Sequence, residues 1–440
     1  MGERYIVAVE LSSSKIVAAV GKPLPGGVLQ VIATEEERNI DGIRYGIIQN
    51  LEETSMSVSR VFNRLEQRSG VAPRKIKSVI VGLSGRSLRN IATEVSMPLP
   101  DETEIDDQIL TRLREQAINS AIDNTLEVID AVPRSYRIGK METLSPKGMV
   151  GNSITGIYDL IVCRPEMTRN IRRTITDKLH LEMNGFVVTA MATGHLILSH
   201  DEKKLGCMLV DIGAETTTVT IYKNGALRYF ATLPMGGRNI TRDIMSLGET
   251  ESHAEEIKRT SGNAFPDNEN PSTLNIGGIR LSDVSNLVIA RSEEIVANII
   301  EQISYAGMKE SDLSKGIVLI GGGAKLQGFM DLLAQQSDLP VRMGYLPDYV
   351  KTDGNHKPLS AEMTEVLSVL YAGATLSDCD CLETPAKGEL PINGVLDFGE
   401  TEEKKEEKTE KPPKKKNILE KLTEGIANMF GNPDDDSEII

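Results

Sequence analysis

Two apolar stretches, far apart in the chain, share one order of hydrophobic and polar positions. They cover residues 5–20 and 207–222. Each begins with a run rich in β-branched residues that ends in a carboxylate, Glu10 in the first stretch and Asp211 in the second, and continues through small residues into another apolar run. This pattern predicts two β-hairpins with an acidic residue at the end of the first strand. The repeat indicates a duplicated α/β domain with a cleft between its halves.

The segments around these hairpins alternate between helical and extended patterns. The expected helices lie at residues 50–69, 101–124, 167–180, 239–246, 253–260, 282–306 and 326–335, and the expected strands at residues 78–83, 126–132, 153–162 and 317–320. Alternation of this kind favours mixed α/β layers. Residues 400–416 differ, because they are nearly all Glu, Lys, Thr and Pro, and we expect a disordered tether there.

Composition narrows the classes of protein and of partner. The chain has 440 residues, of which 40% are hydrophobic and 26% charged, and this suits two or more globular domains. Its formal net charge of −15 argues against nucleic acid as a partner, because phosphates would repel it. The first apolar stretch contains Glu10 and Lys15 and lacks a leading basic segment, so a signal peptide is not expected. No uncharged apolar run reaches the roughly 18 residues that suggest a membrane-spanning helix.

The four cysteines are expected to be reduced thiols of a cytosolic protein. Cys379 and Cys381 could belong to a metal site, but two ligands are fewer than a structural zinc site needs. Cys163 ends a predicted strand, and we expect it in the core rather than as a nucleophile. Cysteine chemistry therefore gives no functional site at this stage.

A pair of opposed hairpins is well suited to hold the phosphates of a nucleotide. A tight turn directs backbone N–H groups at phosphate oxygens, and nearby carboxylates can hold Mg²⁺, usually through its water ligands. Glu10 and Asp211 are the candidates for that ion, and Ser12 and Gly213 stand at matching places in the two turns. The alternative is that both acids merely end edge strands, but the matched pair favours a nucleotide site.

A run of three glycines forms the third feature of the predicted site. Gly321, Gly322 and Gly323 follow the strand predicted at residues 317–320 and precede the helix predicted at residues 326–335. Glycine lets the backbone approach a ligand closely, and the start of a helix offers free N–H donors. Many strand–helix turns use such glycines, so the position of this run after the two hairpins is what carries the argument.

These three features, in this order, resemble the superfamily of actin, sugar kinases and 70-kDa heat-shock ATPases. Within it the chain is most similar to the FtsA family of bacterial cell-division proteins, through residues 81–86, 233–243 and 254–258. The resemblance implies an α/β fold of actin-like (ribonuclease H-like) duplicated domains around a nucleotide cleft, with a small inserted α/β subdomain. It also implies ATP and Mg²⁺ as cofactors.

The resemblance implies a set of nucleotide-binding residues as well. These are Ser12, Ser13, Ser14, Lys15, Gly213, Ala214, Glu215, Thr216, Thr217, Gly236, Gly237, Glu255, Lys258, Gly321, Gly322, Gly323 and Ala324, with Glu10 and Asp211 at the metal. Glu255 or Glu256, together with Lys258, would approach the ribose. Without the resemblance, the same three residues would be interpreted as the solvated face of a helix.

The chain departs from the superfamily within the two turns. Glycine is usual where this chain has Ser12, and a Gly-Gly pair is usual where it has Ala214 and Glu215. Side chains at these places crowd the turns, and Glu215 adds a negative charge near the expected triphosphate. We therefore expect ATP binding without efficient hydrolysis and assign no catalytic residue. His195 lies in the connecting segment at residues 193–198 and is interpreted as structural.

The resemblance also divides the chain into subdomains. Their expected limits are 1–84 for subdomain 1A, continued by 166–200 and 362–384; 85–165 for an inserted subdomain 1C; 201–235 for subdomain 2A, continued by 311–361; 236–310 for subdomain 2B; 385–416 for a disordered linker; and 417–431 for an amphipathic helix. The resemblance implies that the inserted subdomain contributes to filament contacts.

The predicted C-terminal helix has one apolar face. Asn417 and Glu420 are spaced to cap its start, and Gly431 and Pro433 end it. Lysines lie just upstream, so we expect it to bind an anionic membrane surface. The membrane-binding residues would be Lys415, Lys416, Ile418, Leu419, Leu422, Ile426, Met429 and Phe430. The alternative is a helix that packs on a partner or on the body of this chain.

The resemblance implies a protein that binds ATP, polymerises and anchors the tubulin-like division protein FtsZ to the inner face of the cytoplasmic membrane at the division septum. Its partners would be FtsZ, further copies of itself, later division proteins that it recruits, and anionic lipids, but no nucleic acid. The alternatives are a small-molecule kinase of the sugar type and a pilus-assembly or chaperone-like ATPase of the same superfamily. The predicted insert shows no cluster of substrate-binding residues, which argues against the kinase.

Overall fold

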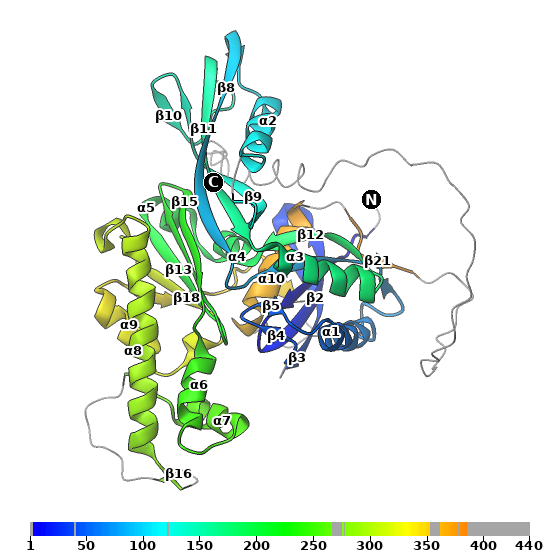
Figure 1. The fold of residues 1–440 in the computed structure, drawn as a ribbon. Coiled ribbons are helices and arrows are strands. Elements are labelled where there is room, and N and C mark those ends of the chain that lie inside the picture. Colours follow the sequence, from blue (N-terminus) through cyan, green and yellow to red (C-terminus); the bar gives the residue numbers. More distant parts are fainter. Residues whose placement is uncertain are drawn as a thin grey trace, which may run out of the picture.

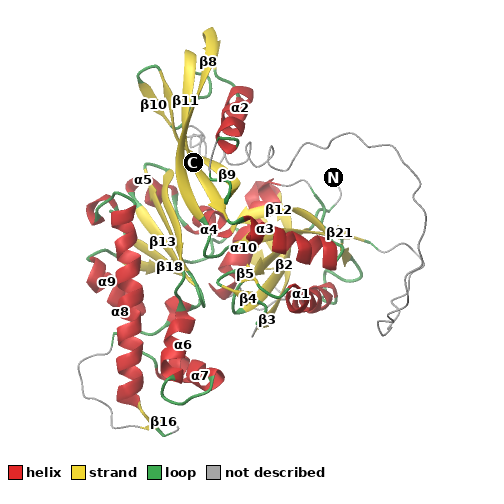
Figure 2. Cartoon of the chain, in the orientation of Figure 1, coloured by secondary structure: helices red, strands yellow, loops and turns green. Residues whose placement is uncertain are grey.

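The computed structural model describes residues 3–38, 41–120, 123–265, 275–276, 278–352, 361–376 and 379–384. Two bodies, each built on a sheet with helices, lie beside each other, and a smaller unit extends from them (Figure 1). Helices and strands are mixed in both bodies (Figure 2). We call the body that contains the first hairpin lobe I, the body that contains the second hairpin lobe II, and the smaller unit, residues 89–163, the insert.

Both predicted hairpins are present, one in each lobe. Their strands, together with one parallel neighbour each, are β1 (Ile6–Leu11), β2 (Lys15–Leu24) and β7 (Ser78–Leu83) in lobe I, and β13 (Cys207–Ile212), β14 (Thr217–Lys223) and β18 (Ile317–Ile320) in lobe II. β1 pairs antiparallel with β2 and parallel with β7. β13 pairs in the same way with β14 and β18. Glu10 and Asp211 thus occupy matching positions, each one residue before the end of its strand.

Lobe I is built on a sheet of six strands. Its further elements include β3 (Val28–Arg38), α1 (Leu51–Glu66), β12 (Glu182–Val188), α4 (Thr189–Ile197), β20 (Val350–Thr352) and α10 (Thr364–Leu376). The strand order is β12-β7-β1-β2-β3-β20. Every residue of β1 and β7 is buried, because both strands are central, and this explains why they are continuous apolar runs. The side chain of Asn50 accepts a hydrogen bond from the N–H of Glu53 and caps α1.

Lobe II carries the longest helix of the described chain, α8 (Leu281–Tyr305). Its further elements include α5 (His200–Leu205), β15 (Ala226–Leu233), α6 (Gly237–Met245), α7 (Glu251–Ser261), α9 (Phe329–Ser337) and β19 (Val341–Met343). An apolar core lies between the sheet of lobe II and these helices and includes residues from β13, β18, α6 and α8. The start of α6 is docked directly on the turn between β13 and β14, which places it at the candidate site.

The insert extends the sheet of lobe II. Its elements are β8 (Arg89–Glu104), α2 (Asp107–Ile118), β9 (Glu127–Ile138), β10 (Met141–Thr143) and β11 (Val150–Cys163). β8 pairs with β15 through Arg89 and Ala231, so nine strands run in the order β10-β9-β11-β8-β15-β14-β13-β18-β19. The insert also has an apolar core of its own, which includes Leu113 and Tyr158.

A buried carboxylate strengthens the junction between the insert and lobe II. Asp159 is fully buried and accepts hydrogen bonds from Arg134, at 2.5 and 2.9 Å, and from the amide of Asn90, at 2.6 Å. The side-chain oxygen of Asn90 in turn accepts the N–H of Phe230 in β15, at 2.9 Å. The insert is therefore tied to lobe II by side chains as well as by the strand pairing.

The structure corrects several of the predicted boundaries. The helix predicted at residues 101–124 is wrong at its start, since residues up to Glu104 belong to β8. Asp106 caps the true helix by accepting the N–H of Ile109, so α2 begins at Asp107. β8 was missed because none of its described side chains is fully buried, so the strand has no continuous apolar run. The helix predicted at residues 167–180 begins at Pro165 as α3 (Pro165–Arg172) and continues as a wider π-helical turn, Arg173–Lys178.

The predicted tether and the predicted membrane-binding helix lie outside the described residues. The same holds for Lys415, Lys416 and the apolar positions from Ile418 to Phe430. In the part of the chain that the structure covers, no helix is both long enough and apolar enough to cross a membrane.

Candidate functional site

Glu10 is held at the end of β1 by groups of lobe I. Its side chain is buried, with the residue 2% exposed. Its two carboxylate oxygens accept hydrogen bonds from the hydroxyls of Ser84, at 2.6 Å, and Thr189, at 2.8 Å. Gly82 in β7 makes room for it, because a Cβ atom at that position would collide with Glu10 Oε2. The neighbouring strand is thus shaped around this carboxylate.

Asp211 has a matching environment at the end of β13. Gly321, directly after β18, has a positive φ of 87°, and a Cβ atom there would collide with Asp211 Oδ1. That oxygen is buried and has no hydrogen-bond partner within the described part of the chain. A buried, unpartnered carboxylate oxygen is costly unless a ligand or ion compensates it. The environment of Asp211 therefore fits a bound cation.

The two acids lie near each other and near a third carboxylate, Glu365 of α10. Burial, together with the charge of Glu365, raises the pKa of Glu10 to about 7, although the hydroxyls of Ser84 and Thr189 oppose the rise. Burial also raises the pKa of Asp211 well above its ordinary value, followed by the effects of Glu365 and then Glu10. Glu10 and Asp211 therefore meet at one site between the lobes. Glu365 was missed by the sequence analysis, which predicted no helix at that place.

The carboxylates are not arranged to coordinate a metal ion directly. Among the residues that the structure describes, no three His, Cys, Asp or Glu side chains are grouped closely enough to hold one metal ion. Glu10 is buried and Asp211 has one buried oxygen, and such a pair without direct coordination geometry fits an ion that keeps its water ligands, as Mg²⁺ commonly does. The donor set is all oxygen, which also suits this ion.

The two hairpin turns are closed by the same type of hydrogen bond. Ser12 donates its N–H to the carbonyl of Lys15 at 3.0 Å, and Gly213 donates its N–H to the carbonyl of Thr216 at 2.8 Å. These two N–H groups serve the turns themselves. The hydroxyl of Ser12 also donates to the Lys15 carbonyl, at 2.8 Å, so this side chain fits within the turn.

The glycine segments expected at the site come together around Gly237. Its N–H donates to the carbonyl of Gly213 at 2.9 Å. A Cβ atom on Gly237 would lie 3.7 Å from the Cα of Gly323 and 3.6 Å from Lys258 Nζ. A Cβ atom on Gly236 would lie 2.5 Å from the Gly213 carbonyl oxygen. Predicted site residues from four separate segments of lobe II thus meet in one place.

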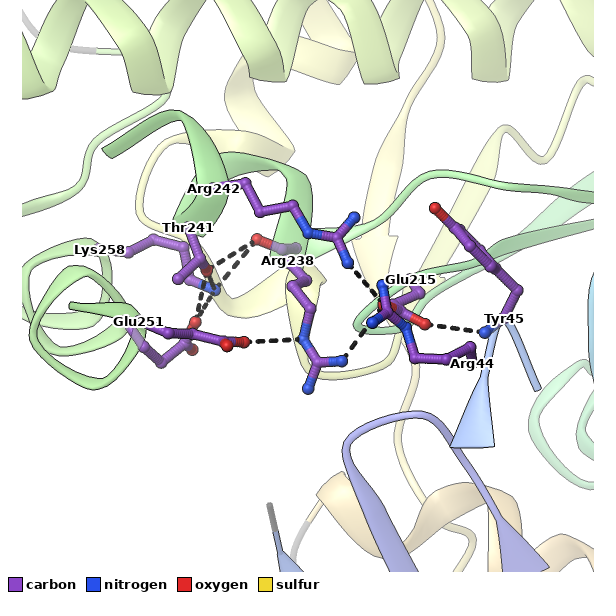
Figure 3. A network of polar contacts seen from close by, with 10 residues as sticks. Arg44, Tyr45, Glu215, Arg238, Thr241, Arg242, Glu251 and Lys258 are labelled. Carbon is purple, nitrogen blue, oxygen red and sulfur yellow. Dashed lines mark hydrogen bonds and ion pairs between the residues drawn. The ribbon is translucent and has the colours of Figure 1, made fainter. Parts of the chain in front are cut away.

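Lys258 is not part of a solvated helix face. Its side chain is 13% exposed, and its amine donates to the hydroxyl of Thr241 at 3.0 Å (Figure 3). The same amine donates to the carbonyl of Gly237 at 3.2 Å and to Glu255 at 2.6 Å. Burial lowers the pKa of Lys258, while the adjacent Glu255 opposes that change. Of the two glutamates considered, Glu255 is drawn into this network, and Glu256 is exposed.

Glu215 does not present an uncompensated charge, contrary to the expectation from the sequence. Its carboxylate is fully buried and lies 2.8 Å from Arg44, 3.3 Å from Arg238 and 2.8 Å from Arg242 (Figure 3). It also accepts the N–H of Tyr45 at 2.8 Å. Burial by itself would raise the pKa of Glu215, but the Tyr45 N–H and the guanidinium groups outweigh it, and the pKa is lowered.

The triple-glycine run differs from the prediction on its C-terminal side. A short 3₁₀ turn, Gly323–Lys325, comes next, and Gly328 adopts a left-handed conformation with φ of 72°. α9 therefore begins only at Phe329, so its N-terminal N–H groups do not start at the glycines. The helix was predicted to start at Leu326, which is three residues too early. Close backbone approach remains, since a Cβ atom on Gly323 would collide with Ile212.

His195 and the cysteines Cys163, Cys207 and Cys381 are structural. His195 lies in α4, stacks with the ring of Tyr371 at 6.4 Å between ring centroids, and has its pKa lowered to about 4 by burial. Cys163 and Cys207 are buried, and burial raises the pKa of both thiols to about 12. Cys381 is buried as well and contacts Asn184.

Comparison with known proteins adds independent sequence information. The family described as "Cell division protein FtsA" matches residues 208–361, and "SHS2 domain inserted in FTSA" matches residues 85–162. The cell division protein FtsA of Porphyromonas gingivalis is 32% identical over 360 residues, covering 78% of this chain and 73% of that protein. FtsA of Pseudomonas aeruginosa is 29% identical over 371 residues, covering 81% and 87%.

A solved structure supports the same fold. The PilM-PilN type IV pilus biogenesis complex is similar with a TM-score of 0.59, over 84% of this chain and 98% of that chain. At 16% sequence identity this likeness shows the fold alone. The predicted fold class is confirmed, namely an actin-like fold of mixed α/β lobes with an inserted SHS2 domain. Given the sequence relatives and this shared architecture, the chain belongs to the FtsA family of bacterial cell-division proteins.

Proposed function

We propose that this protein binds ATP with Mg²⁺ between its two lobes and acts as an actin-like scaffold of cell division. One observation carries the nucleotide: Gly213, Gly237, Gly323 and Lys258 converge from four segments. Backbone without side chains can approach a phosphate or a nucleoside closely, and the amine of Lys258 lies beside this backbone. A nucleotide is a ligand that would use the close approach together with this cation.

Mg²⁺ would be held by Glu10 and Asp211 through its water ligands. The buried, unpartnered oxygen of Asp211 supports this assignment. The raised pKa of both acids supports it as well, because a divalent cation would allow both carboxylates to lose their protons. The ion would neutralise the charge of the phosphates next to these acids. Glu215 would take part through its backbone, since its carboxylate is bonded to arginines.

Calorimetry with Mg-ATP tests this site with a matched pair of variants. Lys258→Met removes the buried amine beside Gly237 and Thr241, and we expect at least about tenfold weaker binding, equal to roughly 1.4 kcal/mol. Arg259→Met removes the adjacent, exposed cation of the same helix and should leave the affinity unchanged. Equal affinities for both variants and the unaltered protein would contradict the placement of the nucleotide.

We further propose the cellular role that family membership suggests. The protein would polymerise, bind FtsZ, and attach it through the predicted helix at residues 417–431 to the cytoplasmic face of the inner membrane at the septum, where later division proteins join. Weak single anchors become firm when many are linked in one filament. Co-sedimentation of FtsZ with anionic vesicles should require this protein, and FtsZ that sediments equally without it would contradict the role. The subdomain limits implied by the family resemblance stay predictions.

A further inference from the structure

Glu215 joins the two lobes. It lies in the turn between β13 and β14 of lobe II. Arg238 and Arg242, which bond it from one side, belong to α6 of the same lobe. Arg44 and Tyr45 approach it from the other side (Figure 3). They come from lobe I, from the short hairpin of β4 (Ile43–Arg44) and β5 (Ile47–Ile48), which we call the β4–β5 loop.

The β4–β5 loop is bonded to both candidate phosphate turns. The N–H of Tyr45 donates to Glu215 in the second turn, and the next N–H along the chain, that of Gly46, donates to the hydroxyl of Ser13 in the first turn at 2.9 Å. Tyr45 and Gly46 both have positive φ, at 51° and 73°. The loop therefore adopts a conformation in which consecutive N–H groups reach opposite sides of the site.

The loop is fixed to lobe I independently of Glu215. Arg86 donates its N–H to the Tyr45 carbonyl at 3.1 Å. A Cβ atom on Gly46 would lie 2.5 Å from the Cα of Gly85, so the two backbones are in close contact. If the lobes part, the loop must stay with lobe I, and its two bonds to Glu215 must break.

Glu215 keeps partners on its own side when those bonds break. α6 is docked on the same turn through the N–H of Arg238, which donates to the carbonyl of Ala214 at 2.7 Å. Arg238 and Arg242 consequently move with Glu215 and continue to compensate its charge. Opening breaks charge-assisted hydrogen bonds without leaving a buried carboxylate unpaired. Such a contact stabilises the closed arrangement of the lobes and still allows them to separate.

We propose that Glu215 is a positioning residue that latches lobe I to lobe II and sets the rate at which nucleotide enters and leaves the site. This inference rests on the proposed function. The latch is formed before nucleotide binds and stays formed afterwards, and it breaks only while the lobes are apart. Loss of the latch therefore lowers the free-energy barriers to nucleotide association and to nucleotide dissociation equally, and it leaves the affinity for the nucleotide nearly unchanged. A direct ligand contact would behave differently, since its loss raises only the dissociation rate.

The test measures both rate constants for radiolabelled Mg-ATP, by filter binding and by a chase with excess unlabelled ATP. Glu215→Gln should raise the association and dissociation rate constants about tenfold each, equal to about 1.4 kcal/mol in the barrier, with the Kd within about twofold. Arg44→Met removes one of the two lobe I partners and leaves Glu215 with the N–H of Tyr45, Arg238 and Arg242. Because Glu215 itself is unchanged, this variant is the check in case Glu215→Gln misfolds. It should raise both rate constants as well, and the double variant should be no faster than the faster single one.

Glu251→Gln is the matched control. Glu251 pairs with Arg238 at 3.3 Å in the same network, but its side chain is 57% exposed, and its partner lies in lobe II. This variant should leave both rate constants unchanged. Unchanged rates in Glu215→Gln and Arg44→Met would overturn the inference, and so would faster dissociation with unchanged association. Absence of ATP binding by the unaltered protein would overturn the proposed function first, and the latch with it.

Discussion

Glu10 should make the nucleotide-free protein less stable at neutral pH than near pH 4.5, and Glu10→Gln should remove this pH dependence. The carboxylate is buried, with its pKa raised from 4.5 to about 7. Because the folded protein holds this proton more tightly than the unfolded chain does, unfolding releases it. The free energy of unfolding therefore falls as the pH rises from about 4.5 to about 7, and the loss is complete above that range.

The magnitude follows from the same values. A rise in pKa from 4.5 to about 7 corresponds to about 3 kcal/mol between the two protonation states. Gln has no proton to lose and keeps the size and much of the hydrogen bonding to Ser84 and Thr189. Relative to the unaltered protein, Glu10→Gln should therefore gain about 3 kcal/mol of stability between pH 4.5 and pH 8.

Urea unfolding followed by circular dichroism at several pH values measures this gain. Glu94→Gln, at an exposed position of the insert, is the control and should show no such pH dependence. If the stability difference between Glu10→Gln and the unaltered protein stays constant from pH 4.5 to pH 8, the reasoning is refuted. A variant that loses stability relative to the unaltered protein as the pH rises would refute it more strongly.

Three further outcomes are expected. Asp159→Ala should destabilise the protein by about 3–5 kcal/mol, because it leaves a guanidinium unpaired at the junction of the insert with lobe II; Glu94→Ala should cost less than about 1 kcal/mol in the same urea titration. Cys163 should resist iodoacetamide at pH 8 in the folded protein, since burial raises the pKa of its thiol to about 12, and rapid alkylation seen by mass spectrometry would disagree. Replacing Leu422 and Phe430 by Asp should abolish sedimentation with anionic vesicles, and unchanged sedimentation would count against the membrane helix.

The cores of the two lobes were predictable because they depend on local patterns. β7 and β18 begin and end where their apolar runs do, since central strands are buried on both faces. The match between Glu10 and Asp211 was visible for the same reason, because each acid follows a recognisable run. The long strand β8 was not predicted, since its surface positions alternate with positions that are only partly buried.

The contacts that cross the molecule could not be predicted from spacing. Glu215 was interpreted as an unfavourable charge because its partners Arg44 and Arg238 lie in other segments of the chain. Glu365 was missed since nothing in its local sequence marks it as a neighbour of Asp211. The role of Gly82 was hidden in the same way, because only the pairing of β7 with β1 brings it against Glu10. Each of these residues acts through tertiary neighbours.

The structure of this protein with Mg²⁺ and a non-hydrolysable ATP analogue tests the central claim most directly. The account predicts phosphates beside the turns that begin at Ser12 and Gly213, and a hydrated Mg²⁺ next to Glu10 and Asp211. It also predicts the nucleoside against Gly237, Gly323 and Lys258. A nucleotide bound elsewhere, or a site that stays without nucleotide at saturating concentration, would contradict it.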